Sequence, residues 1–268
     1  MALKKEIKIQ RKKDLKGKCI RSYLSYLWDF YKTLIFILLV LFTAGIAFFF
    51  NLHTQKDTAL GIVFLNPVKN EDALWERIKT DIGVTLELNE EKENVLIQEA
   101  HYQYPGGIST QYDAASQVSI RNKLENGSMD ILTADAYNFN AFLYGSTAFY
   151  DLRDVLSEDQ LARYKDILFY VDMEKIKAFQ KKIQSNPRSV QSDSPDAESI
   201  IKEEKEDNWV KPDPEEMEEP VPVGIIVTDS SYLRQNGLYG EYVCVMGLCS
   251  SSRHTDLFCR YVDFLLGS

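Results

Sequence analysis

The segment Ala59-Leu-Gly-Ile-Val-Phe-Leu65 is apolar at every position, so a strand formed here has no polar face to turn toward water. Strands that are buried on both faces are typical of parallel sheets covered by helices on each side. Asn66-Pro67 follows at once and ends the strand. We therefore expect residues 59–65 to form an inner strand of an α/β sheet.

Helical and strand patterns alternate downstream of this strand. Leu74, Ile78 and Ile82 recur at the spacing of one helix face, and Gly83 is placed to end that helix. The next patterns are a strand at residues 95–100, a helix over about residues 110–126 and a strand at 130–134. This alternation predicts the α/β class, with a mostly parallel sheet and helices on both of its faces.

The chain changes character between residues 181 and 220, which are acidic and lack apolar periodicity, apart from Trp209-Val210. Such a segment buries too little surface to offset its ordering entropy, so we interpret it as a linker or insertion pinned by Trp209. Order returns with strands at residues 223–228 and 242–249 and a final amphipathic helix that ends at Gly267. The predicted domain therefore has two parts, residues 58–180 and 221–267.

Upstream of the domain, Thr33 to Phe50 contains no charged residue and would span about 27 Å as a helix. With Asn51 and Leu52 it reaches roughly the thickness of a hydrocarbon core, so residues 33–52 are predicted to be a transmembrane helix in the lipid bilayer. The preceding arm, residues 1–32, holds ten Lys or Arg against three acids. Basic flanks stay inside, which predicts a single-pass protein of the cell membrane with a cytoplasmic N-terminus and an extracytoplasmic domain.

A cleavable signal peptide is the alternative for the same apolar segment. Its basic region would be about 32 residues long, and its apolar run exceeds the usual length of about 7–15 residues. Ala44, Gly45 and Ala47 are followed by three phenylalanines and make a poor cleavage site. The sequence therefore favours an uncleaved anchor.

The charge of the chain is divided unequally. After residue 53 there are 21 Lys or Arg against 37 Asp or Glu, a net charge near −16. A domain this acidic repels phosphate backbones, so nucleic acid is excluded as its partner.

Three cysteines follow the apolar segment: Cys244, Cys249 and Cys259. An odd number cannot form a complete disulfide framework, and each lies in an apolar or helical pattern. Buried thiols are the favoured interpretation, while one bridge with a free thiol, or a metal site with His254, are the alternatives.

No catalytic motif is present: the chain lacks a Gly-x-Ser-x-Gly elbow, a Walker loop, a His-Glu-x-x-His helix and a Cys-x-x-Cys pair. We therefore predict a protein that is not an enzyme, with no catalytic residues, no metal site and no cofactor. An exported hydrolase with an unrecognised site is the minor alternative.

Polar and aromatic residues follow several of the predicted strands. In open α/β sheets, ligands bind beyond the carboxyl ends of the strands, near a switch in strand order. The candidate ligand-binding residues at these positions are Asn66, Asp135, Tyr137, Asn138 and Asp229. Each is also a residue type common in helix caps and turns.

Two segments carry a resemblance to a known family. They are Met129-Asp-Ile-Leu-Thr-Ala-Asp135 with the later Phe149–Ser157, and Ser252-Arg-His-Thr-Asp256 leading into Arg260–Leu265. Both resemble the type 2 periplasmic-binding-protein fold of extracytoplasmic solute-binding proteins, over residues 58–172 and 221–267. Such proteins have two lobes, but the roughly 50 residues between Asp172 and Val221 are too few for a second one.

The resemblance implies a non-enzymatic, membrane-anchored domain reduced to about one lobe. It would bind a small-molecule ligand, or contact an ABC-type permease or another membrane protein. The alternative function is a structural or accessory subunit that interacts with another membrane or envelope protein.

Overall fold

The computed structural model describes residues 20–54, 56–69, 71–101, 111–144, 148–185, 209–239 and 242–267. The chain divides into two compact units, Met1–Gln55 and Lys56–Ser268. Most of the basic arm, residues 1–19, lies outside the described residues, as does the middle of the acidic segment at 186–208.

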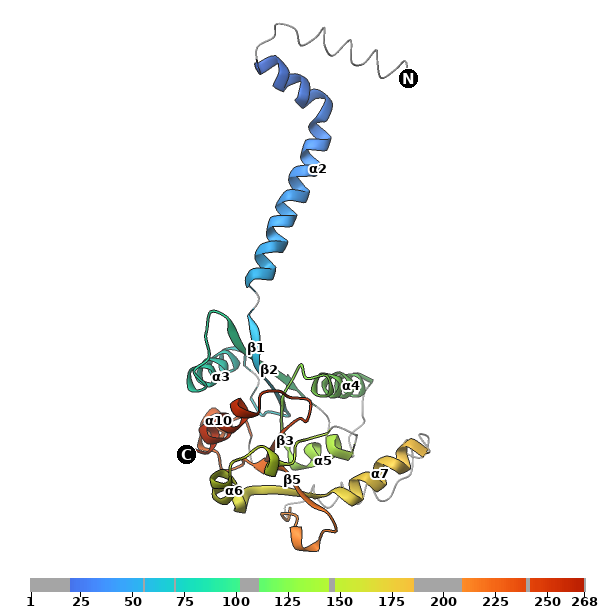
Figure 1. Cartoon of the computed structure of the whole chain (residues 1–268), viewed down its shortest axis with the longest axis vertical. Coiled ribbons are helices and arrows are strands. Elements are labelled where there is room, and N and C mark those ends of the chain that lie inside the picture. The colour runs from blue at the N-terminus through green and yellow to red at the C-terminus, as the bar shows by residue number, and fades with distance from the viewer. Residues whose placement is uncertain are drawn as a thin grey trace. The chain divides into compact units, whose positions relative to one another are not determined.

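The first unit contains one long helix, α2 (Ile20–Thr54) (Figure 1). Its apolar side chains are exposed, among them Leu38, Phe42 and Phe48. The hydroxyl of Thr43 donates to the backbone oxygens of Leu39 and Val40, each at 3.0 Å, so this polar group is satisfied within the helix. Among the described residues, no helix is both long and apolar enough to cross a membrane. In the apolar part of α2, the longest run of consecutive residues with described side chains is 31–46.

The second unit is built on a six-stranded sheet with the order β2-β1-β3-β6-β5-β4. Its strands are β1 (Asp57–Leu65), β2 (Glu93–Ala100), β3 (Ile131–Asp135), β4 (Leu168–Asp172), β5 (Pro220–Ile226) and β6 (Cys244–Leu248). β2 and β3 both pair with β1 in parallel, whereas β6 pairs with β3 and β5 antiparallel, and β4 pairs with β5 antiparallel.

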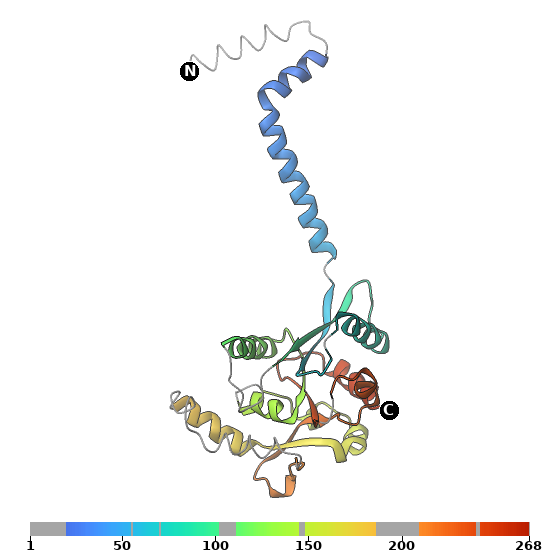
Figure 2. The same cartoon turned by 180° about the vertical axis from the view of Figure 1, so that it is seen from behind.

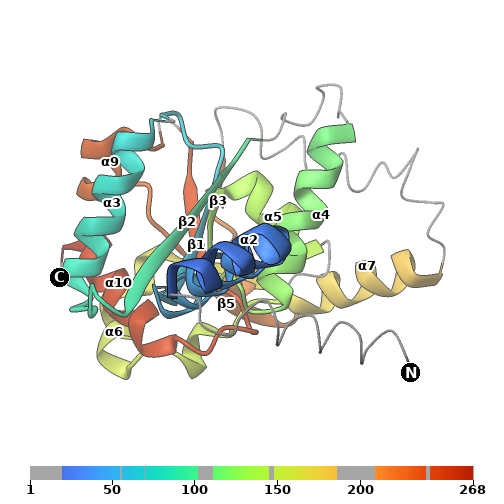
Figure 3. The same ribbon diagram turned by 90° about the horizontal axis from the view of Figure 1, so that it is seen from above.

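Helices cover both faces of the sheet (Figure 3). The chain goes outward from β1 through α3 (Asp72–Thr85) to β2, then back through α4 (Gln111–Glu125) to β3 on the other side of β1. Because crossovers between parallel strands are right-handed, these two opposite steps place α3 and α4 on opposite faces.

Each face has its own apolar core. The core on the α3 side also takes residues from α6 (Glu158–Tyr164), α9 (Ser231–Asn236) and α10 (Thr255–Leu266). The core on the α4 side takes residues from α5 (Ala136–Tyr144) and α7 (Met173–Ser185). Short 3-10 turns, η1 (Leu152–Asp154), η2 (Lys165–Ile167) and η4 (Pro214–Glu216), complete the described elements.

The acidic segment leaves and re-enters the domain between two neighbouring antiparallel strands. α7 continues from the end of β4, and the chain later returns in β5, which pairs with β4 (Figure 2). The carboxylate of Asp172 accepts hydrogen bonds from the backbone N–H groups of Glu174, Glu218 and Glu219, so it joins the exit to the return. Burial raises the pKa of this carboxyl, but the three N–H groups and the charge of Lys175 together outweigh burial and lower the pKa overall. The Trp209 ring stacks on Phe169 at 6.5 Å between centroids. Trp209 therefore contacts the domain, as predicted for the one apolar point of the acidic segment.

The α/β class and helices on both faces are confirmed, as is the role of the tail, since β6 and β5 extend the sheet from β3. The predicted mostly parallel sheet holds for β2-β1-β3, but the remaining pairings are antiparallel, so the sheet as a whole is mixed. Two local predictions are wrong. α3 continues past Gly83 to Thr85, and β4 was not expected as a strand.

Two glycines in this unit provide a matched test of packing. A Cβ at Gly61 in β1 would lie 2.8 Å from the Cα of Met129, whereas a Cβ at Gly83 in α3 would meet nothing within 4 Å. We expect Gly61→Ala to lower the free energy of unfolding by about 1–3 kcal/mol, because backbone atoms must move apart. Gly83→Ala should raise it by about 0.5–1 kcal/mol, because alanine restricts the unfolded chain and favours the helix.

Denaturant unfolding of the full chain in detergent, followed by circular dichroism, measures both effects. Equal stability of the two variants would contradict the close contact between β1 and the residue before Asp130.

Candidate functional site

The carboxyl edge of the sheet has a switch in strand order between β1 and β3, where ligands commonly bind in this fold class. Pairing of these two strands ends at Phe64 and Thr133. Asn66 then adopts a left-handed backbone with φ of 55°, which asparagine tolerates better than most residues. Its N–H donates to the oxygen of Ala100 at 2.8 Å, which fixes the end of β1 to the end of β2.

Three of the five predicted site residues meet at this switch. Asp135 is the last residue of β3 and is 3% exposed. Its Oδ1 accepts from the N–H of Asn138 at 3.0 Å, and its Oδ2 accepts from Asn138 Nδ2 at 2.7 Å and Asn66 Nδ2 at 3.3 Å. Asp135 thereby caps the first turn of α5, and the bonds draw β1, β3 and α5 together.

The other two predicted residues do not join this cluster. Tyr137 is half-buried in the first turn of α5. The side chain of Asp229 is 87% exposed, and its carboxylate forms an ion pair with Arg234. A surface pair of this kind contributes little to stability, so Asp229 is better described as a turn residue than as part of the edge.

Tyr239 is the residue of this edge that the sequence did not reveal. Its hydroxyl lies 3.0 Å from the backbone oxygen of Leu65 and 2.9 Å from that of Thr133. It therefore sits between the separated ends of β1 and β3. The residue is 8% exposed, and burial raises the pKa of the hydroxyl well above its usual range, with further contributions from Cys244 and Asp135. The sequence signal was slight, a tyrosine between Gly237 and Gly240.

The structure agrees with the favoured interpretation of the three cysteines as thiols packed in the fold. Cys244 and Cys249 are free and buried, and Cys259 is free and half-buried. Burial raises the pKa of all three thiols, which makes them poor nucleophiles and poor metal ligands. Among the residues that the structure describes, no group of three His, Cys, Asp or Glu side chains is placed to hold a metal ion.

A second polar cluster lies at the opposite, amino edge of the sheet. The buried carboxylate of Asp130 accepts from Gly61 N–H at 2.8 Å and from Ser252 Oγ at 2.6 Å, and it lies 3.0 Å from His254 Nδ1. The two segments that carry the family resemblance therefore meet here. Aspartate, serine and histidine are the residue types of a hydrolase triad, but Asp130 stands between the other two, and Ser252 is 3% exposed. The geometry joins the tail to the sheet rather than activating a nucleophile.

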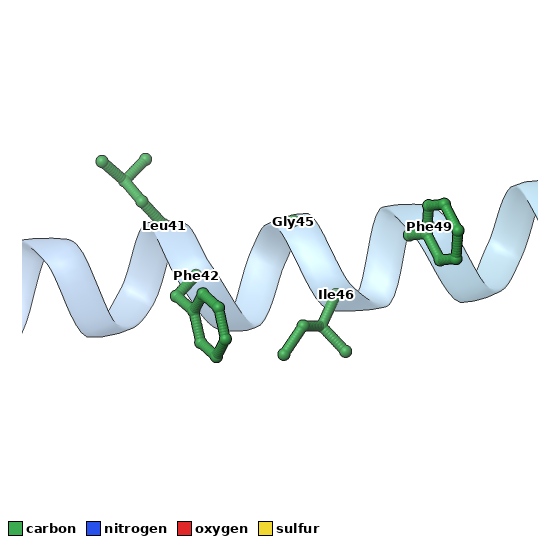
Figure 4. A pocket seen from close by; sticks show the side chains of 5 residues that line it. All are labelled: Leu41, Phe42, Gly45, Ile46 and Phe49. Carbon is green, nitrogen blue, oxygen red and sulfur yellow. The ribbon is translucent and has the colours of Figure 1, made fainter.

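A hollow lined by Leu41, Phe42, Gly45, Ile46 and Phe49 belongs to α2 in the other unit (Figure 4). One helix forms it, because Gly45 has no side chain between larger neighbours. It contains no polar or charged side chain that would orient a ligand.

Comparison of the chain with protein-family models, with curated proteins and with solved structures gave no match. The assignment of function therefore depends on the geometry of the two edges and on the properties of α2.

The cap at Asp135 gives a direct prediction. Asp135→Ala should lower the free energy of unfolding by about 1–2 kcal/mol, because the Asn138 N–H and the amides of Asn138 and Asn66 lose their acceptor. Asp135→Asn keeps an acceptor and should cost less. Asp229→Ala, the exposed control, should change stability by less than about 0.5 kcal/mol. Thermal or denaturant unfolding of the three variants distinguishes them, and a neutral Asp135→Ala would contradict the capping role.

Proposed function

We propose that this protein is a non-enzymatic, membrane-anchored extracytoplasmic binding domain, and that the carboxyl edge of its sheet is the binding surface. The observation that carries the proposal is the switch in strand order between β1 and β3, with Asn66, Asp135 and Asn138 gathered at it. Open α/β sheets bind their ligands at such a point because the diverging strands leave backbone and side-chain polar groups unpaired by the ladder.

α2 supports the membrane anchor. The segment Thr33–Phe50 has no charge, and its described large apolar side chains are exposed to an extent that water disfavours. A bilayer covers such side chains, and the backbone of a helix needs no partner from the lipid. The inward hydrogen bonds of Thr43 also suit a hydrocarbon surrounding. The ten basic residues before Thr33 favour a cytoplasmic N-terminus, since basic flanks are retained inside.

The layout of the domain supports an origin from one lobe of a solute-binding protein. The excursion between β4 and β5 leaves and returns on adjacent antiparallel strands, as an inserted second lobe would. Here it is too short to form a lobe with its own core. A single lobe contacts a ligand from one side only, so affinity for a small ligand is low and a membrane protein such as a permease is an equally suitable partner.

A second candidate is an accessory subunit whose domain binds only another protein. It is favoured by the internal bonding of the edge, since Asp135 and Asn138 are buried and bonded to one another. The exposed ring of Tyr242 and the exposed side chain of Val68 flank this edge in sequence and suit contact with a protein.

The topology can be tested in intact cells. Protease added outside should digest the chain beyond His53 and leave the basic arm intact, because the anchor keeps residues 1–32 inside. A tag at each terminus, detected by blotting, shows which fragments survive the protease. Recovery of a soluble protein that begins near Phe48 would contradict the anchor.

The binding surface can be tested with the full chain in detergent, by a thermal-shift screen with amino acids, sugars, oligopeptides and metal ions. We expect a shift that is lost in Tyr137→Ala, since this half-buried tyrosine belongs to the carboxyl edge. Tyr170→Ala, another half-buried tyrosine but on β4, is the matched control and should keep the shift. Absence of any shift, together with capture of an identified membrane protein, would favour the accessory subunit.

A further inference from the structure

The outer edge of β2 is not paired with any other strand in the part of the chain that the structure describes, because β2 stands first in the order of the sheet. We propose that this edge binds an extended, basic segment of another protein, which pairs with β2 as a further strand. The proposal goes beyond the carboxyl edge and does not depend on it, because it concerns a different surface.

Two hydrogen bonds show how the backbone of β2 is oriented. The N–H of Asp57 donates to the oxygen of Lys92 at 2.7 Å, at the start of the strand. The N–H of Asn66 donates to the oxygen of Ala100 at 2.8 Å, at its end. The even-numbered residues of β2 therefore direct their backbone groups toward β1. Because the strand has a period of two, the odd-numbered residues direct theirs away from β1.

The outward-facing groups of β2 are available for pairing. They are the N–H and C=O groups of Val95, Ile97 and Glu99, and no described residue donates to them or accepts from them. Regular spacing of free donors and acceptors along one edge is what an added strand requires, since main-chain hydrogen bonds supply much of the affinity in this kind of recognition.

β2 also lacks the features that usually protect an edge strand. Such strands are kept from pairing by shortness, bulges, proline, lysine or a covering segment. β2 is eight residues long, contains neither proline nor lysine, and leaves the Leu96 side chain 41% exposed. At the opposite edge, β4 has five residues, shifts register between Phe169 and Tyr170, and is contacted by Trp209. The contrast indicates that β2 is the edge left open.

The charges along β2 indicate which partner fits. Its only charged residues are Glu93 and Glu99. The described hydrogen bonds to these carboxylates come from neutral donors, the N–H of Asn89 at 2.8 Å and Nε1 of Trp75 at 2.5 Å. Both negative charges are thus without a described cation. Lys or Arg side chains on an added strand would form cross-strand pairs with them, which stabilise a sheet.

A second copy of this chain fits the edge less well. Antiparallel pairing of two β2 strands about Leu96 would bring Glu93 of one copy opposite Glu99 of the other, and like charges directly opposite each other are unfavourable. The net charge near −16 after residue 53 also makes two copies repel. A segment with basic and apolar residues meets neither penalty, and its apolar side chains would cover Leu96 and the half-buried Ile97.

The test uses the full chain in detergent and a labelled peptide, Lys-Val-Thr-Val-Thr-Val-Lys with blocked ends, followed by fluorescence anisotropy. We expect it to bind at least about tenfold more tightly than the same peptide with Glu in place of both Lys, because its charges complement those of β2. A version N-methylated along its central residues should bind at least about tenfold more weakly, because it keeps the charges but cannot donate to the edge.

Two substitutions locate the peptide on the domain. Leu96→Lys places a positive charge on the edge and should weaken binding of the basic peptide by at least about tenfold. Val210→Lys makes the same change of charge at an 82% exposed residue next to Trp209, beside the opposite edge. This control should keep the affinity within about twofold of that of the unmodified protein.

Amide hydrogen exchange, resolved by residue, is a second measurement that needs no variant. The peptide should slow exchange at Val95, Ile97 and Glu99, whose N–H groups face outward. It should change exchange much less at Leu96 and Gln98, whose N–H groups already bond to β1. Absence of this alternation, equal binding of the N-methylated peptide, or no binding of the basic peptide would overturn the proposal.

The oligomeric state distinguishes the other occupant of the edge. A dimer of the full chain that Leu96→Lys dissociates would also overturn the proposal, since a second copy would then fill the edge. Failure here is separable from failure of the proposed function. The Tyr137→Ala screen reports on the carboxyl edge alone, and the basic peptide should bind that variant as it binds the unmodified protein.

Discussion

The structure of the domain depends on the contact between Gly61 of β1 and the residues just before β3. Met129 approaches so closely that only a glycine fits at position 61, and the Gly61 N–H donates to the buried carboxylate of Asp130. The same carboxylate accepts from Ser252, 122 residues later in the chain. A buried carboxylate is costly unless donors surround it. Its satisfaction therefore requires β1, β3 and the start of the final helix to be in place together, which couples the two parts of the domain.

The opposite edge of the sheet has a different character. At the amino edge, every oxygen of Asp130 has a close donor or a histidine nitrogen beside it. At the carboxyl edge, one tyrosine hydroxyl serves two carbonyl oxygens, and a threonine hydroxyl is left without a partner. The two edges thus differ in which backbone and side-chain groups satisfy their buried polar atoms. Binding sites are expected where hydrogen bonding is incomplete, because a ligand there gains contacts that the protein does not make with itself.

The acidic segment leaves the domain and returns to it between two neighbouring strands of the sheet. β4 and β5 pair antiparallel, and Asp172 joins the exit of the chain to its return by accepting from the N–H groups of Glu218 and Glu219. These bonds hold the two ends of the acidic segment together, whatever its length.

The sequence by itself determined the inner strand, the alternation of helices and strands, the final helix and the acidic interruption, because each of these is recorded in local periodicity or composition. It also identified Asn66, Asp135 and Asn138 as neighbours, since the ends of parallel strands share an edge. Only the tertiary structure decided that β6 adds antiparallel to β3 and β5 to β6, that β4 is a strand, and that the Tyr239 hydroxyl bonds to the ends of both β1 and β3. These depend on partners that are not neighbours in sequence, as the separations of 106 and 174 residues between Tyr239 and its two acceptors illustrate. A single residue type such as tyrosine carries no local pattern that reveals which distant backbone atoms its hydroxyl will meet.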